Sequence, residues 1–151
     1  MPDNENFLHV AANRLSEKTF AAAQHAANEA EFRIPFQAAI AEAAQTIGAP
    51  IQPRDEVSLI EGRADTVYNR LVIEYERPGF LNAKKQTANN LHAIQQIKDY
   101  ITGLQRRERH KMDRYAGVVC DGCFFIFCRY RDDQWHIEAP VPVDIYSCER
   151  F

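Results

Sequence analysis

Segments typical of β-strands occur in two groups in this chain, and each group follows a helical segment. The first group, near residues 56–61, 64–68 and 71–77, is rich in Val, Ile, Leu and Tyr and contains apolar–polar alternation. The second group comprises a hairpin at residues 116–130 and a strand at residues 135–138. This order of helix, strands, helix, strands predicts a mixed α/β domain with a central β-sheet.

Alanine content and apolar spacing indicate where the helices lie. Residues 1–48 are rich in alanine, which has the highest intrinsic helix propensity. Pro35 interrupts this region, and it predicts either the first turn of a new helix or a kink in a continuous one. Gly48 and Pro50 then end the helix. Residues 86–107 carry apolar side chains three or four positions apart, which predicts one amphipathic helix.

Length and composition indicate one domain. We expect it to span residues 1–151, with residues 1–28 as a helical N-terminal appendage and residues 140–151 as a C-terminal tail or linker. No stretch approaches about 18 uninterrupted apolar residues, and the N-terminus lacks a signal-peptide pattern, so we expect a cytoplasmic protein without a membrane partner. The net charge of −3 means that contact with nucleic acid would need a local basic patch or a partner segment.

Cys120 and Cys123 form a C-x-x-C pattern, which occurs in zinc sites as well as in hairpins. Asp121-Gly122 between them favours a two-residue type I′ turn, in which both residues have positive φ, and strand-forming residues flank it. A zinc site needs a second pair of ligands at a suitable spacing, and the other two cysteines do not provide one. We therefore predict a hairpin with free thiols.

The acidic residues of the first strand group suggest a function. Side chains alternate along a strand, so Glu74 and Glu76 share one face with their Cα atoms about 6–7 Å apart. Asp65, on the partner strand of a hairpin, would add a third carboxylate. Clustered carboxylates repel one another unless a cation lies among them, and Mg²⁺ prefers oxygen ligands. Such an ion could polarise a phosphate and activate water, whereas the alternative is an ordinary solvated strand face.

The pattern resembles the PD-(D/E)XK nuclease superfamily, in which an Asp on one strand precedes Glu-x-Lys on the next. Asp65 corresponds to the Asp, with Ala64 before it instead of Pro, Glu74 corresponds to the Glu, and Glu76 stands where Lys is usual. The flanking sequence is similar to nuclease domains attached to restriction–modification methylases or helicases. The resemblance covers about residues 29–130 and implies a restriction-endonuclease-like fold, with a central mixed β-sheet flanked by helices in αβα order.

The resemblance also implies further site residues. Glu31 resembles the Glu that the family often places on the preceding helix, and Glu29 and Glu42 are less favoured alternatives. Gln96 and Tyr100 match a Gln-x-x-x-Tyr pattern, whose two side chains share one helical face. The implied metal ligands, for Mg²⁺ with Mn²⁺ as a substitute, are Asp65, Glu74 and Glu31. The implied catalytic residues are Asp65, Glu74, Glu76, Gln96 and Tyr100.

Glu76 in place of Lys leaves three alternatives open. Glu76 could act as a general base or a further metal ligand, Lys84 or Lys85 could supply the missing charge in space, or the site could bind without cutting. The basic residues that we predict to contact DNA phosphates are Arg63, Lys84, Lys85, Arg106 and Arg107. The alternative for the run at residues 106–114 is a solvated helix end.

Taken with the resemblance, the sequence predicts a Mg²⁺-dependent endodeoxyribonuclease domain that hydrolyses DNA phosphodiester bonds. We expect it to belong to a larger restriction–modification or DNA-processing protein, with a fused or associated methylase or helicase, or to form a homodimer. The runner-up is a catalytically inactive nuclease-fold module for DNA binding or assembly. A third hypothesis is a protein-interaction domain whose acidic residues are merely exposed.

Overall fold

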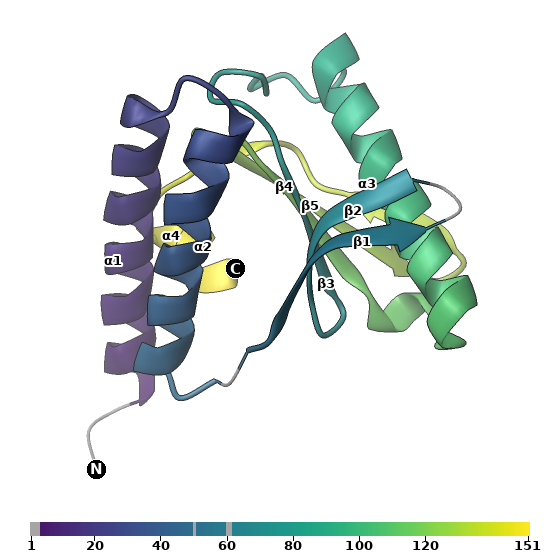
Figure 1. Ribbon diagram of the computed structural model, residues 1–151, viewed down its shortest axis with the longest axis horizontal. Helices are drawn as coiled ribbons and strands as arrows, with labels where there is room; N and C mark the ends of the chain where they lie inside the picture. Colours follow the sequence, from purple (N-terminus) through teal and green to yellow (C-terminus); the bar gives the residue numbers. More distant parts are fainter. Residues whose placement is uncertain (1–3, 50, 60–61) are drawn as a thin grey trace.

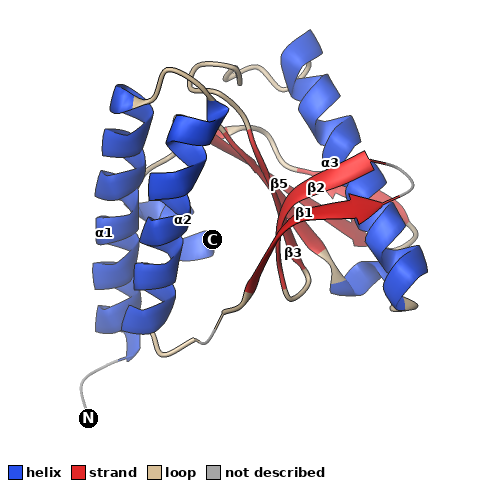
Figure 2. Ribbon diagram, viewed as in Figure 1, coloured by secondary structure: helices blue, strands red, loops and turns tan. Residues whose placement is uncertain are grey.

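A β-sheet lies between two layers of helices in the computed structural model, which describes residues 4–49, 51–59 and 62–151 (Figures 1 and 2). In chain order, its elements are α1 (Asn4–His25), α2 (Glu29–Thr46), β1 (Pro53–Leu59), β2 (Gly62–Tyr68), β3 (Leu71–Tyr75), α3 (Ala88–Glu108), the 3₁₀ helix η1 (Met112–Arg114), β4 (Ala116–Cys120), β5 (Phe124–Arg131), β6 (Gln134–Ile137), β7 (Val141–Pro142) and α4 (Ile145–Arg150). The predicted mixed α/β class, with a central sheet flanked by helices, is confirmed.

The strands of the described residues form one sheet in the order β1-β2-β3-β4-β5-β6, and β7 pairs with β5. β3 and β4 are parallel, while the other neighbours are antiparallel. Parallel neighbours need a long crossover connection, and α3 provides it. Figure 1 shows α1, α2 and α4 on one face of the sheet and α3 on the other. The sheet therefore separates two hydrophobic cores.

Side chains of β3 alternate between these two cores, as the sequence predicts. Ile73 and Tyr75 pack into the core that contains Phe36 of α2. Val72 packs into the other core, with Ile97 of α3. Because alternate residues of a strand share a face, Glu74 projects from the side of the sheet that α3 covers.

The alanine-rich region is interrupted at residues 26–28 and not at Pro35. Asn28 is the N-cap of α2, and its side-chain oxygen accepts a hydrogen bond from the Glu31 backbone N–H at 3.0 Å. Pro35 lies inside α2, beyond its first turn, so it does not begin a new helix and lies within a continuous one. The side chain of Asn28 satisfies a helix-terminal N–H, which favours starting a new helix at Glu29.

Both ends of the chain contribute to the core. α1, inside the segment expected as an appendage, buries Ala12 and Leu15 in the core that it shares with α2. At the other end, residues 140–151 form β7 and α4, and Cys148 is buried in the same core. The ring centroid of Phe151 lies 5.4 Å from that of Phe125. The two terminal segments are therefore packed parts of the layered fold.

The boundaries of the strands differ from the prediction by a few residues. The first strand begins at Pro53, and the predicted strand at residues 56–61 includes residues 60–61, which lie outside the described residues. β3 ends at Tyr75, although the Glu76 N–H still donates to the Cys120 carbonyl oxygen at 2.9 Å. This bond keeps Glu76 beside the end of β4.

The predicted hairpin of β4 and β5 is confirmed, but its turn is not the two-residue type I′ turn. The last strand pair is Cys120 with Phe125, and of the two central residues Gly122 alone has a positive φ, +85°. Asp121 is fully buried, and its Oδ1 accepts hydrogen bonds from the backbone N–H groups of Cys123 and Phe124, each at 2.9 Å. An Asp side chain that accepts from the backbone two residues further on forms an Asx turn, and this side chain shapes the loop. All four cysteines are free thiols.

Candidate functional site

Asp65 and Glu74 lie on neighbouring strands, at the end of the β2–β3 ladder. The last residue pair of this ladder is Thr66 with Ile73. Beyond it, the Tyr75 N–H donates to Asp65 Oδ2 at 3.0 Å, so a side-chain carboxylate replaces the next backbone acceptor of the ladder. Asp65 is held against the Glu74–Tyr75 segment by this bond. The sequence prediction that β2 and β3 bring these two acids together is therefore confirmed.

Glu74 is more deeply buried than Asp65, with only 5% of its surface exposed. Burial raises the pKa of Glu74 to about 9, and the neighbouring charges of Asp65, Glu76 and Glu29 add to the increase. Its Oε2 atom is buried and has no hydrogen-bond partner among the described residues. An unpaired buried carboxylate oxygen is costly, so Glu74 either keeps its proton or needs a cation beside its ionised form.

Two further glutamates complete what we call the acidic cluster: Glu29, Asp65, Glu74 and Glu76. Burial raises the pKa of Glu76 to about 7, and the charges of Glu29, Asp65 and Asp121 act in the same direction. Burial also raises the pKa of Glu29, helped by the charge of Asp65. Glu29, in the first turn of α2, therefore lies near the carboxylates that β2 and β3 contribute.

Glu31, the residue that the resemblance favoured on this helix, has a different role. Its Oε2 accepts the Ala27 N–H at 2.8 Å, and its Oε1 accepts from the Asn28 side chain at 3.1 Å. Together with the bond from its own N–H to Asn28, these contacts make Glu31 part of the N-terminal cap of α2. The structure thus brings Glu29 to the acidic cluster and leaves Glu31 at the exposed helix start.

Gln96 and Tyr100 of α3 lie beside the acidic cluster. Burial raises the pKa of the Tyr100 hydroxyl to about 12, and the charges of Glu74 and Asp65 raise it further, while a hydrogen bond with the Gln96 side chain opposes the shift. The Tyr100 ring also packs on Gly62, where an added Cβ would lie 2.9 Å from Tyr100 Cε1. A residue without a side chain therefore lets α3 approach the start of β2 closely.

Positive charge near the acidic cluster comes from arginine. Arg33 and Arg63 lower the pKa of Asp65 against the effect of burial, and Arg77 does the same for Glu76. Within the described part of the chain, however, no Lys or Arg nitrogen lies within 4.0 Å of an oxygen of these four carboxylates. The cluster is therefore an electrostatically strained group with no direct counter-ion.

The carboxylates of the acidic cluster are near one another without forming a ready-made metal site. Among residues 4–49, 51–59 and 62–151, no group of three or more His, Cys, Asp or Glu side chains is arranged so that it could hold a metal ion. The cluster fits a hard cation in its chemistry, because its donors are carboxylate oxygens and one of them is buried and unpartnered. Binding would require the side chains to rotate towards a common point.

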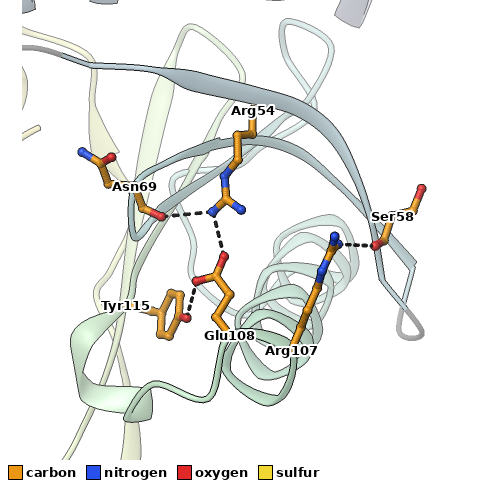
Figure 3. Close-up of polar contacts among 6 residues, drawn as sticks. All are labelled: Arg54, Ser58, Asn69, Arg107, Glu108 and Tyr115. Atoms are coloured by element: carbon orange, nitrogen blue, oxygen red, sulfur yellow. Dashed lines mark hydrogen bonds and ion pairs between the residues drawn. The ribbon is translucent and has the colours of Figure 1, made fainter.

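Arg107, predicted to contact DNA, makes a structural contact within the domain. Its guanidinium donates to the Ser58 carbonyl oxygen at 3.1 Å and so links the end of α3 to β1 (Figure 3). Beside it, Glu108 accepts a hydrogen bond from Arg54 at 2.8 Å and another from the Tyr115 hydroxyl at 2.7 Å (Figure 3). This network joins α3 and β1 to Tyr115, the residue before β4, and the exposed Arg106 lies in the same turn of α3 as Arg107.

The other predicted DNA-contacting residues are spread over the surface. Lys85 donates to the Ile137 carbonyl oxygen at the end of β6, and Lys84 is exposed in the loop before α3. Arg63 lies next to the acidic cluster and also forms a loose ion pair with Glu56, with Nη1 and Oε2 3.8 Å apart. Arg63 is thus the member of the predicted set that is near Asp65.

Sequence reasoning gave too little weight to Glu29 and overlooked Arg33 and Asp121. A usable signal was present for the first of these, because Asn28-x-x-Glu31 is a capping-box pattern that assigns Glu31 to the helix start. The spacing of Glu29 and Arg33 places both on one face of α2. No local pattern predicts that Asp121 is buried, because its carboxylate accepts hydrogen bonds from two separate segments. One is the turn that contains Cys123, and the other contains Leu81, whose backbone N–H donates at 2.9 Å.

Comparison of the chain with known protein families, with curated proteins and with solved structures finds no match. None of the described helices combines the length and the apolar character needed to cross a membrane. Fold and site together define a mixed α/β domain with a largely buried acidic cluster where β2 and β3 meet α2 and α3.

Proposed function

We propose that the acidic cluster binds a divalent cation, with Mg²⁺ as the ion, and that this domain hydrolyses phosphodiester bonds of DNA. The observation that supports cation binding is Glu74, whose Oε2 is buried and unpartnered among three other carboxylates. Carboxylate oxygens are the protein ligands that Mg²⁺ prefers. A fused or associated methylase or helicase stays a prediction that depends on the resemblance to PD-(D/E)XK nucleases.

Asp65 and Glu74 would hold the cation in this proposal, and Glu29 replaces Glu31 as the third ligand. When bound, the ion would polarise the phosphate and lower the pKa of a bound water. Tyr100 and Gln96 position the cluster from α3, since the Tyr100 hydroxyl lies beside Glu74 and Asp65. Arg63 and Arg33 supply positive charge for the phosphate that approaches Asp65.

Glu76 has the charge properties of a proton acceptor at neutral pH. Its pKa of about 7 leaves it ionised in roughly half of the molecules near that pH. A catalytic base works best when its pKa is close to the working pH, because it then accepts and releases a proton readily. We therefore propose that Glu76 takes a proton from the water that attacks phosphorus.

A catalytically inactive module that binds without cutting is the second candidate, and one observation favours it. Lys85 bonds to the Ile137 carbonyl oxygen, so it does not stand in for the usual catalytic Lys. The third hypothesis, a domain with merely exposed acids, fits the structure less well. Glu74 is 5% exposed and Asp65 is half-buried, whereas a solvated strand face would leave both open to water.

A plasmid-nicking assay with Mg²⁺ or Mn²⁺ tests the proposal. We expect the wild-type chain to nick DNA and Glu74→Gln to lose at least about a hundredfold in rate, as the loss of a ligand of a catalytic ion predicts. Glu31→Gln is the matched control, because it removes a carboxylate charge from the same helix region without touching the cluster, and it should retain activity.

Calorimetric titration with Mn²⁺ separates the alternatives. Mn²⁺ binding that requires Glu74, together with no nicking under any condition, would support the inactive module and contradict the hydrolase. Absence of both Mn²⁺ binding and nicking in the wild-type chain would contradict the cation site itself.

A further inference from the structure

An open groove of about 610 Å³ lies on the face of the sheet that α4 borders, along β5 and β6. Arginines from β5 and α4 line it: Arg129, Arg131 and Arg150. Arg129 is paired across the ladder with His136 of β6, which also lines the groove. Arg129 and Arg131 share one face of β5 because they are two positions apart. The carboxylates of Asp132 and Glu138 also line the groove, so it collects three arginines from two elements against two acidic side chains.

The three arginines of this groove differ in their partners. Arg150 forms an ion pair with Glu138, and its guanidinium lies 4.6 Å from the ring centroid of Phe127. Arg129 and Arg131 are exposed, and within the described ranges their guanidinium groups have no hydrogen-bond or ion-pair partner. The groove thus contains one neutralised guanidinium and two that are available to a ligand.

This groove is separate from the acidic cluster. Glu76 is hydrogen-bonded to Cys120, at the end of β4 that pairs with Phe125. Arg129 pairs with Ala116 at the opposite end of β4, and Arg131 lies beyond it. The two sites are therefore at opposite ends of the central strands, and the groove is not explained by the chemistry of the carboxylates.

We propose that Arg129 and Arg131 bind successive phosphates of a nucleic-acid strand. Their Cα atoms are about 6–7 Å apart along β5, which is close to the separation of neighbouring phosphates in an extended strand. Each guanidinium presents a planar pair of N–H donors that matches the oxygens of one phosphate. That the ligand is nucleic acid rests on the proposed function. The two arginines add a contact surface that does not involve the cation.

Fluorescence anisotropy of a labelled duplex in EDTA tests this surface without any contribution from a metal ion. We expect the double variant Arg129→Ala/Arg131→Ala to bind at least tenfold more weakly than the wild-type chain. The slope of log K against log salt should become less negative by about 1.8, since each lost phosphate contact contributes about 0.9. Both arginines are exposed, and an unchanged melting temperature would show that the variant remains folded.

Arg14→Ala/Lys18→Ala is the matched control, because it removes two positive charges of α1 that pair with Glu42 and do not line the groove, and it should change affinity by less than about twofold. Equal losses in the two double variants would overturn the proposal, since net charge alone would explain them. It would also be overturned if inorganic phosphate or polyglutamate bound with the same dependence on Arg129 and Arg131 while the duplex did not bind.

The same experiments distinguish failure of the proposed hydrolysis from failure of phosphate binding in the groove. Glu74→Gln should bind the duplex in EDTA as tightly as the wild-type chain does. If nicking fails while binding depends on Arg129 and Arg131, hydrolysis is contradicted and the groove is supported. If nicking depends on Glu74 but binding is indifferent to the two arginines, the groove is contradicted and hydrolysis is supported.

Discussion

Replacing Glu74 with Gln should stabilise the folded chain at neutral pH, even though it removes a proposed metal ligand. The folded-state pKa of Glu74 is about 9, against an ordinary value of 4.5. Between these two values, the folded chain keeps a proton that the unfolded chain has released. The contribution of Glu74 to stability is therefore fully present below pH 4.5 and is lost progressively as the pH rises towards 9.

The size of the effect follows from the same two values. About 2.5 pH units separate the ordinary pKa from pH 7, and each unit corresponds to about 1.4 kcal/mol, so protonating Glu74 costs the folded chain about 3 kcal/mol at pH 7. Gln has the shape of the protonated acid and avoids this cost. Glu74→Gln should therefore be more stable than the wild-type chain by about 3 kcal/mol at pH 7, and by less than about 1 kcal/mol at pH 5.

Urea unfolding in EDTA at pH 5, 7 and 8.5 measures the effect, with Glu31→Gln as the control. Glu31→Gln removes an exposed carboxylate of α2 outside the acidic cluster, so it controls for the loss of one negative charge. For Glu74→Gln, a free-energy difference that stays constant from pH 5 to 8.5, or a loss of stability at pH 8.5, would refute the reasoning. Either result would mean that Glu74 is ionised in the folded chain and that another group compensates its charge.

Three further measurements test other parts of the structure. Mn²⁺ affinity should rise by up to about tenfold per pH unit between pH 5 and 7, because the ion must displace the proton of Glu74, and calorimetric titration would show a flat profile if it does not. Asp121→Ala should cost about 3 kcal/mol or more in urea unfolding, since three backbone N–H groups lose their acceptor, whereas Asp121→Asn, which keeps one oxygen, should cost less. Gly62→Ala should cost about 1–3 kcal/mol because its Cβ would displace Tyr100, and a melting temperature equal to that of the wild-type chain would contradict this packing.

The fold class was predictable because its signals are local and periodic. Alternation in residues 71–77 correctly placed Ile73 and Tyr75 in one core and Val72 in the other. The same alternation put Glu74 on the face of α3, and the turn at Asn69 brought Asp65 next to it. A pattern with period two specifies the two faces of a strand, so the convergence of these acids depended on little else.

The remaining features of the site were not predictable from local patterns. How deeply Glu74 is buried depends on α2 and α3, which pack on the sheet from distant parts of the sequence. Whether Glu29 or Glu31 faces the cluster depends on the residue at which α2 begins, and Asn28 determines that residue. Helix boundaries are the least certain part of a sequence-based assignment, and a shift of two positions exchanges one face of a helix for another.

The Glu76→Gln variant can distinguish the alternatives that remain open because Glu76 stands where the nuclease superfamily usually has Lys. Since its pKa is about 7 without a metal ion, a role as general base predicts that nicking increases with pH near 7 and that Glu76→Gln loses this limb of the profile while binding Mn²⁺ normally. A role as ligand predicts the opposite pair of results, because a directly bound cation favours the ionised carboxylate and keeps its pKa far below 7. In that case, Glu76→Gln would weaken Mn²⁺ binding. If Glu76→Gln altered neither the pH profile of nicking nor Mn²⁺ affinity, the carboxylate at this position would have no part in the chemistry.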